Sequence, residues 1–341
     1  MKERQVTIKD LARKLDISVS TVSRALRSLP DVNPETKKRV IELAEELNYE
    51  PNTIALSLVT KRTNTVGVII PSFIIHFYSA AITGMQEVLS ARGINTIICQ
   101  SAESLENEIR NVNTLLASRV DGIIGSLSIE TSSTEHLEKI KRKGIPLILF
   151  NRTTGDLHVP TAEVDDYQGA VDAVQHLVDQ GFKRIAHIAG PGALNISQMR
   201  KNGYLDVLKR SNMPIDEELI LPCDFSMESG AECTERLMSL THPPDAAFVV
   251  SDSAAFGAIR YLQDRKLRIP EDLALVGFTN EPLSSLVNPP LTTVSQPSRE
   301  IGRAAAELFL AQLDQEPEDR TPSHKILKPE LVIRESSLKK S

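Results

Sequence analysis

Hydroxyl side chains and a single arginine are concentrated in residues 18–24, which read SVSTVSR. Serine and threonine hydroxyls can both donate and accept hydrogen bonds, and an arginine fork can bind a guanine edge or a phosphate. Short side chains also let a protein backbone come close to a duplex. The segment therefore has the chemistry to read DNA, and its candidate contacts are Ser18, Val19, Ser20, Thr21, Ser23 and Arg24.

The surrounding residues predict three short helices that position this segment. Thr7 can cap a first helix, with Asp10 as its capping-box partner. Asp16 ends that helix, because aspartate tolerates the left-handed backbone of a tight turn. Ser18 caps a second helix, and Asn33 followed by proline opens a third. The inward-facing apolar positions are Ile8, Leu11, Ala12, Leu15, Val22, Ala25, Leu26, Val40, Ile41, Ala44 and Leu47.

Two short helices joined by a tight turn form a helix-turn-helix, whose second helix presents its first residues to base edges. A generic three-helix packing unit is the alternative. The outward face of the second helix lacks the Glu and Lys mixture of an ordinary solvated helix, and this favours DNA binding.

Composition and charge indicate a chain of two or three domains in a reducing compartment. Residues 1–62 carry 12 Lys and Arg against 9 Asp and Glu, whereas the remainder carries 27 against 36. The N-terminal segment is thus mildly basic and the rest of the chain is acidic, which fits a DNA-binding segment attached to a larger acidic domain. The cysteines, Cys99, Cys223 and Cys233, lack metal-ligand spacing, and the chain shows no secretory leader or membrane-spanning run. We therefore expect a cytoplasmic protein.

From Thr65 onward, short β-branched runs alternate with amphipathic helical stretches. Buried strands alternating with helices predict parallel sheets covered on both faces. A strand followed by a proline turn occurs in both halves, as TVGVIIP in the first and RIAHIAGP in the second. We therefore expect two doubly wound α/β lobes. The carboxyl ends of their strands should face a shared cleft, where such sheets bind ligands.

Motifs for catalysis are weak throughout the chain. The segment Ala189–Asn195, AGPGALN, lacks the third glycine of a dinucleotide fingerprint and the Lys-Ser/Thr pair of a phosphate loop. No GxSxG nucleophile elbow occurs, and the histidines show neither HxxxH nor HxH spacing. We therefore expect no enzyme activity, no cofactor and no metal site.

The first sixty residues resemble the DNA-binding headpiece of the lac repressor/galactose repressor (LacI/GalR) family, on the motifs VTIKDLA, ISVSTVSRAL, NPETKKRV, LNYEPN and IALSLVTKRTNTVGVIIP. The resemblance implies base contacts by Val19, Ser20 and Arg24. It also implies that residues 52–59 form a hinge helix that wedges Leu58 into the minor groove. The family usually has glycine at Asp16. The full set of expected DNA contacts is Thr7, Ser18, Val19, Ser20, Thr21, Ser23, Arg24, Asn52, Ala55 and Leu58.

The region from about Thr65 to Glu335 resembles the periplasmic-binding-protein-like effector domain of the same family, through VDGII, GIPLILFNR, VDDYQGAVDAVQHL, RKNGYLDVL, PDAAFVVSD, IPEDLALVGF and PPLTTVSQP. These motifs occur in one collinear order. The resemblance implies an effector site made by Pro71, Ile75, Phe77, Tyr78, Ser126, Asn151, Arg200, Ser251, Asp252, Thr279 and Gln296.

Two departures from the family pattern bear on the charge of the effector. Thr279 and Asn151 stand where many sugar-responsive members have aspartate, while Arg200, a principal anchor, is kept. This balance favours a sugar acid or sugar phosphate over a neutral sugar. Nearby acidic or titratable side chains could restore negative charge, namely His158, Glu163 and Asp165.

The expected architecture is a helix-turn-helix headpiece (1–50), a hinge and linker (51–64) and a two-lobed effector-binding and dimerisation domain (65–341). The expected function is a homodimeric regulator, most simply a repressor, that binds a pseudo-palindromic operator and responds to a small carbohydrate-like effector. A solute-binding protein that does not regulate DNA is the alternative. The chain ends without a leucine heptad of the kind that would form tetramers.

Overall fold

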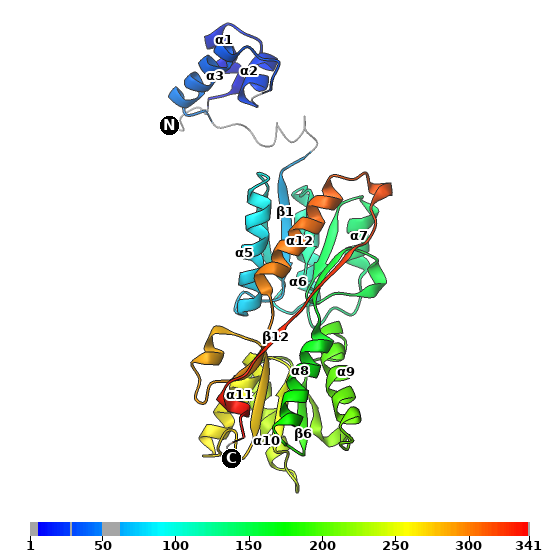
Figure 1. The fold of residues 1–341 in the computed structure, drawn as a ribbon. Helices are drawn as coiled ribbons and strands as arrows, with labels where there is room; N and C mark the ends of the chain where they lie inside the picture. Colours follow the sequence, from blue (N-terminus) through cyan, green and yellow to red (C-terminus); the bar gives the residue numbers. More distant parts are fainter. Residues whose placement is uncertain (1–5, 28, 50–61, 340–341) are drawn as a thin grey trace. The chain divides into compact units, whose positions relative to one another are not determined.

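The computed structural model describes residues 6–27, 29–49 and 62–339. The chain divides into two compact units, Met1–Thr63 and Asn64–Ser341, called here the headpiece and the body (Figure 1). None of the helices within the described ranges has both the length and the apolar character needed to cross a bilayer.

The headpiece contains α1 (Ile8–Leu15), α2 (Val19–Leu26) and α3 (Pro34–Glu46). The Asp10 carboxylate accepts hydrogen bonds from the backbone N–H and the hydroxyl of Thr7, at 3.0 and 2.6 Å. Asp16 adopts the left-handed conformation, with φ 54° and ψ 44°, so the turn forms without glycine. The side chain of Asn33 accepts from the N–H of Glu35 at 2.8 Å. The helices enclose a small core of Leu11, Ala12, Val22, Ala25, Val40 and Ala44.

Each lobe of the body is built on a six-stranded sheet. In spatial order, the first lobe contains β11 (His324–Leu327), β5 (Thr161–Val164), β4 (Leu147–Phe150), β3 (Gly122–Gly125), β1 (Thr65–Ile70) and β2 (Asn95–Gln100). The second contains β12 (Glu330–Val332), β10 (Thr292–Ser295), β9 (Ala274–Thr279), β8 (Ala246–Val249), β6 (Ile185–Ala189) and β7 (Ile220–Pro222). All paired strands run parallel except β12, which is antiparallel to β10.

Helices cover both faces of each sheet, so the predicted doubly wound architecture is confirmed. In the first lobe, α5 (His76–Ser90) and α12 (Ser298–Leu313) pack on one face, and α6 (Leu105–Ala117) and α7 (Glu135–Arg142) on the other. In the second, α8 (Asp166–Asp179) and α9 (Asn195–Arg210) oppose α10 (Met227–Met238) and α11 (Asp252–Asp264). Short 3₁₀ turns cover 155–157, 217–219, 282–285, 317–319 and 335–337.

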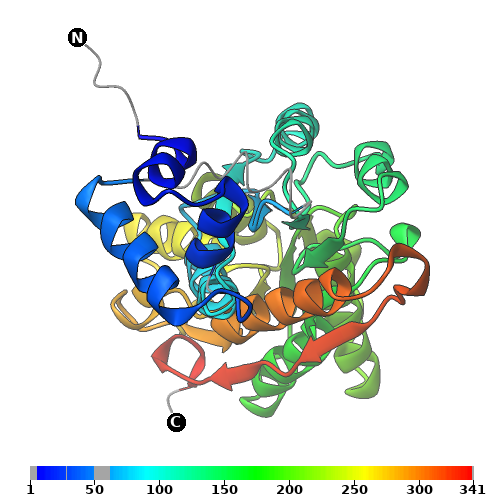
Figure 2. The ribbon, with the colours of Figure 1, turned by 90° about the horizontal axis from the view of Figure 1, so that it is seen from above.

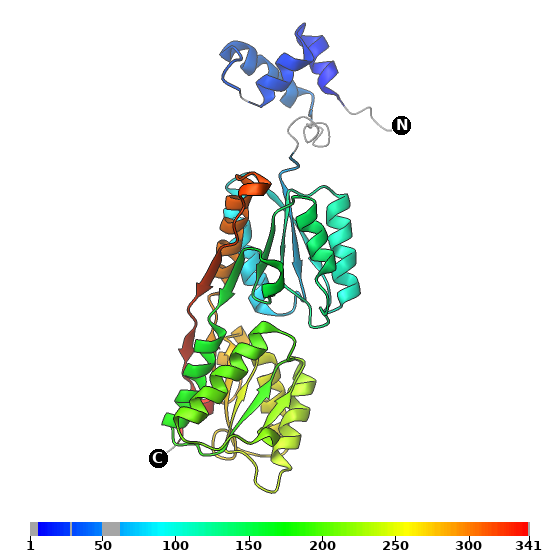
Figure 3. The ribbon, with the colours of Figure 1, turned by 90° about the vertical axis from the view of Figure 1, so that its right-hand side faces the viewer.

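The chain passes between the lobes after β5, after β10 and after β11. Consequently α12 belongs to the first lobe, although the strand before it belongs to the second. Figure 2 shows α12 (orange) beside the C-terminal strands (red), and Figure 3 shows these strands running from one lobe to the other. The sequence did not predict α12, β11 or β12, and it did not predict that the chain passes between the lobes three times.

Glycines permit the close contact between α5 and α12. A Cβ added at Gly302 would lie 1.8 Å from the carbonyl oxygen of Ala81, and one added at Gly84 would lie 2.0 Å from that of Arg299. We expect Gly302→Ala to lower the free energy of unfolding by about 1–3 kcal/mol, because the two helices must move apart. Urea unfolding measures this loss. Gly192→Ala is the matched control, since no atom lies within 4 Å of its added Cβ; equal losses would contradict the packing argument.

Candidate functional site

The residues at the start of α2 form an outward face on the headpiece. Ser18 caps the helix, because its hydroxyl accepts from the N–H of Thr21 at 3.1 Å and lies 2.7 Å from the Ser20 hydroxyl. Val19 is 41% exposed, which is unusual for a valine in a folded domain and suits an apolar contact with a base. Ser20 and Arg24 are also exposed, whereas Thr21 and Ser23 are half-buried.

Arg24 and Thr7 already have partners within the headpiece. The guanidinium of Arg24 contacts the carboxylate of Asp31, just before α3, and both side chains are exposed. Such a pair contributes little and can be exchanged for a phosphate or base. The hydroxyl of Thr7 is held by Asp10. The expected hinge contacts lie outside the described residues and stay predictions: Asn52, Ala55 and Leu58.

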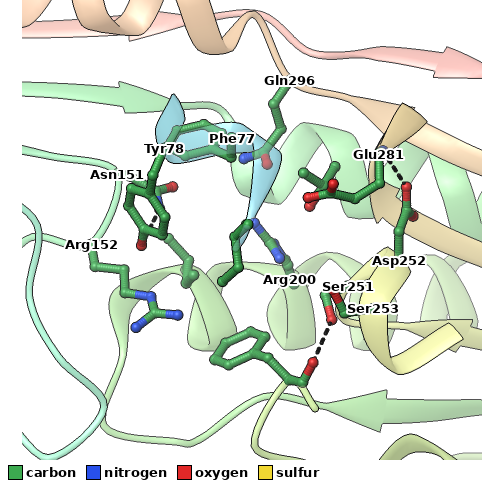
Figure 4. A pocket seen from close by; sticks show the side chains of 14 residues that line it. Phe77, Tyr78, Asn151, Arg152, Arg200, Ser251, Asp252, Ser253, Glu281 and Gln296 are labelled. Atoms are coloured by element: carbon green, nitrogen blue, oxygen red, sulfur yellow. Dashed lines mark hydrogen bonds between the residues drawn. The ribbon is translucent and has the colours of Figure 1, made fainter. Parts of the chain in front are cut away.

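A cavity of about 40 Å³ lies between the two lobes of the body (Figure 4). Its volume accommodates water but is far below the roughly 300 Å³ of a small ligand pocket, so its walls must separate to admit a sugar. The first lobe contributes the start of α5 and the end of β4; the second contributes α9, α11 and the segments after β7 and β9. The lining residues are Ile75, Phe77, Tyr78, Asn151, Arg152, Ile196, Arg200, Phe225, Ser251, Asp252, Ser253, Thr279, Glu281 and Gln296.

The structure thus brings together the expected effector residues except Pro71 and Ser126. Both are buried but do not line the cavity. The hydroxyl of Ser126 lies 3.3 Å from that of Tyr78, which also accepts from the side-chain amide of Asn151 at 3.2 Å. Ser126 therefore supports the wall from behind.

Arg200, on α9, is 3% exposed and is engaged by the protein itself. Its Nε and Nη2 donate to one carboxylate oxygen of Asp166, at 2.8 and 2.6 Å, and its Nη1 donates to the carbonyl of Val250 at 2.6 Å. The guanidinium also stacks 3.7 Å above the ring of Phe278. Burial raises the pKa of Asp166, while Arg200 opposes that rise. Arg200 has a protein counter-ion, which the sequence reading did not anticipate.

Arg152 was also missed, although it directly follows Asn151. Its Nη1 contacts both carboxylate oxygens of Glu103, at 3.0 and 2.7 Å, and its guanidinium lies 5.0 Å from the ring of Phe225 in the other lobe. Arg152 is hard to identify from sequence, because its aromatic partner Phe225 belongs to the other lobe and is distant along the chain.

Several buried polar atoms in the wall lack a hydrogen-bond partner among the described residues. They are Oδ1 of Asn151, Nε of Arg152 and Nε2 of Gln296. Unpaired buried polar groups are costly, so an acceptor and two donors on residues that line one cavity favour a ligand with hydroxyl or similar groups.

The acidic residues of the wall lie in the second lobe. Asp252 accepts from the N–H of Glu281 at 2.8 Å and from the hydroxyls of Ser284 and Thr293, both at 2.6 Å. Burial raises the pKa of Asp252. Ser251 caps α11 by accepting from the N–H of Ala254 at 3.3 Å.

Glu281 was not anticipated. Its carboxylate accepts from the backbone N–H of His76, the first residue of α5, at 3.2 Å, so the contact crosses the cleft. Burial, with the nearby charge of Asp252, raises the pKa of Glu281 to about 7. The three further acidic or titratable residues that the sequence placed near the effector are absent from the wall: His158, Glu163 and Asp165.

Comparison with known proteins identifies both parts of the chain. Residues 7–52 match the family of bacterial regulatory proteins named lacI, and residues 174–337 match the periplasmic binding protein-like domain. Catabolite control protein A of Priestia megaterium is 37% identical over 315 residues, 92% of this chain and 94% of that protein. The chain belongs to the LacI family. The resemblance inferred from the sequence is confirmed, and so is the prediction that this DNA-binding regulator is not an enzyme.

Other relatives align over nearly the whole chain. The HTH-type transcriptional repressor CytR of Escherichia coli K12 is 33% identical, covering 98% of this chain and 97% of that protein. The crystal structure of the lac repressor dimer bound to operator and the anti-inducer ONPF has a TM-score of 0.87 at 25% identity, covering 98% and 100% of the two chains. A complex of the regulator CelR with cellobiose has a TM-score of 0.74 at 29% identity, covering 97% and 100%.

Proposed function

We propose that this LacI-family member is a homodimeric repressor whose affinity for a pseudo-palindromic operator is controlled by a carbohydrate-like effector. One observation supports this proposal most directly. The same chain has an outward α2 face in its headpiece and, in its body, an inter-lobe cavity whose lining residues carry unpaired polar atoms. A relative named as a repressor, the operator-bound lac repressor dimer and the cellobiose-bound CelR support it. Regulation of chromosomal DNA also supports a cytoplasmic location.

The alternative, a solute-binding protein that does not regulate DNA, lacks support. Such a protein needs no headpiece, whereas residues 7–52 match the DNA-binding family over the helix-turn-helix. A two-fold dimer would present two α2 faces to two half-sites, which compensates for the small positive charge of a single headpiece.

Operator reading is tested at Arg24. We expect Arg24→Ala to weaken binding to an operator, first selected from random duplexes with the wild-type protein, by about 1–3 kcal/mol, because one base or phosphate contact is lost. The fold should survive, since Arg24 lies outside the headpiece core. Fluorescence anisotropy measures the affinity. Arg39→Ala, an exposed change of equal charge on α3, is the control; if both variants bind like the wild type, α2 is not the reader.

The chemistry of the wall supports an effector rich in hydroxyl groups. Asn151 offers a free acceptor and Gln296 a free donor, a combination that suits hydroxyls because each hydroxyl both donates and accepts. The sequence favoured a sugar acid or phosphate because of Arg200. That argument weakens once the guanidinium is paired with Asp166. A thermal-shift screen of neutral sugars, amino sugars, sugar acids and sugar phosphates decides among these classes.

A further inference from the structure

The two guanidiniums of the cavity wall are each balanced by a carboxylate outside it. Arg200 is paired with Asp166 at 2.6 Å, and Arg152 with Glu103 at 2.7 Å. Neither Asp166 nor Glu103 lines the cavity. The positive charge that an anionic effector would need is therefore already neutralised by the protein.

The two carboxylates of the wall have no such balance. Among the described residues, neither Asp252 nor Glu281 forms an ion pair. Asp252 is held by one N–H and two hydroxyls, all neutral donors. Glu281 accepts from one backbone N–H of the opposite lobe. Neither carboxylate is therefore neutralised by an ion pair, although the positive charge of Arg334 acts on Asp252.

We propose that Glu281 sets the charge of the effector that the cleft accepts: it excludes compounds that carry a carboxylate or phosphate and favours a polyhydroxylated compound that is neutral or carries an amino group. The inference rests on the proposed function, in which this cavity is the effector site. Glu281 bridges the lobes at the start of α5, so a ligand held between the lobes must contact or displace its carboxylate. A donor on the ligand satisfies that oxygen, whereas a second anion is repelled by it.

The raised pKa of Glu281 agrees with an environment that disfavours a further negative charge. Burial and the charge of Asp252, on α11, raise its pKa to about 7. Among the described residues, the surrounding ionisable groups include Arg200, which lines the same cavity, His76, whose backbone N–H donates to Glu281, and Arg334, which donates to the side chain of Asn280 at 2.9 Å. Since the pKa is raised, the closed cleft binds the extra proton. The contribution of this proton to the free energy of unfolding is fully present below the ordinary pKa of glutamate, and it is lost as the pH rises through about 7.

The experiment uses inorganic phosphate as an anionic probe of the full chain. Thermal unfolding is followed in phosphate and in chloride at equal ionic strength, for the wild type, Glu281→Gln and Glu228→Gln. Glu228 is exposed on α10, so its variant removes the same charge outside the cavity, and phosphate bound elsewhere affects all three proteins alike. We expect Glu281→Gln alone to bind phosphate at least tenfold more tightly than the wild type. Equal phosphate dependence in the three proteins, or no phosphate effect in any of them, overturns the proposal.

A pH series gives a second readout that does not depend on a ligand. The melting temperature of the wild type should fall between pH 6 and 8 relative to that of Glu281→Gln, and a constant difference would also overturn the proposal.

Operator binding is measured on the same proteins. If phosphate binding responds to Glu281 but no cavity ligand changes operator affinity, the proposed function fails while the specificity role of Glu281 stands. If a sugar acid changes the operator affinity of the wild type, the proposed function stands and this inference fails.

Discussion

Arg200→Ala should abolish the response of operator binding to the effector and lower the stability of the body by about 3–5 kcal/mol. The side chains of Arg200 and Asp166 are only 3% and 5% exposed, so removing the guanidinium leaves a buried carboxylate without its counter-ion. The carbonyl of Val250 and the ring of Phe278 lose their partner as well. Urea unfolding, together with an operator titration in the presence of the effector found by screening, measures both effects.

Two further variants separate the role of this buried pair from a general loss of charge. Arg200→Lys should recover only part of the stability, since a single ammonium group cannot reproduce the planar fork that bonds Asp166 and Val250 together. Arg210→Ala is the matched control, because this residue lies at the exposed end of the same helix. Operator affinity without effector should be retained in Arg200→Ala, since the headpiece is a separate compact unit. Wild-type stability of Arg200→Ala would show that the pair contributes nothing.

The local features of the fold could be predicted because they depend on neighbouring residues. The Asp16 turn and the Ser18 and Asn33 caps follow from the conformational and hydrogen-bonding properties of each side chain. The alternation of strands and helices followed from hydrophobic patterning, and the strand ends then placed most of the cavity wall.

Contacts that join distant parts of the chain could not be predicted from those patterns. Periodicity identifies α12 as a helix but cannot assign it to the first lobe. The partner of Arg200 lies 34 residues away, and the contact between Glu281 and His76 spans 205 residues. These long-range pairs bear on the charge of the cavity wall. The sequence favoured an anionic effector because it showed Arg200 without its partner, whereas the proposal made above takes the pairing of Arg200 with Asp166 into account.

A second buried carboxylate has a comparably large expected effect. Glu108, on α6, is 2% exposed, and Ser128 donates to it through both its N–H, at 2.8 Å, and its hydroxyl, at 2.7 Å. The ring of His136, on α7, lies 2.8 Å from its other oxygen. This network ties two helices to the segment after β3, where Ser126 supports Tyr78 in the cavity wall.

Glu108→Ala should therefore lower the stability of the body by about 3–5 kcal/mol, because His136 and Ser128 lose a buried charged partner. Burial alone would raise the pKa of Glu108, but hydrogen bonds from His136 and Ser128 together lower it. Its contribution is thus present above the ordinary pKa of glutamate and is lost as the pH falls through the lower value of the folded state. Urea unfolding between pH 3 and 7 should show the difference between wild type and variant shrinking with acidity. Glu106→Ala, exposed on the same helix, is the control; a difference that stayed constant with pH would mean that the carboxylate charge contributes nothing to the network.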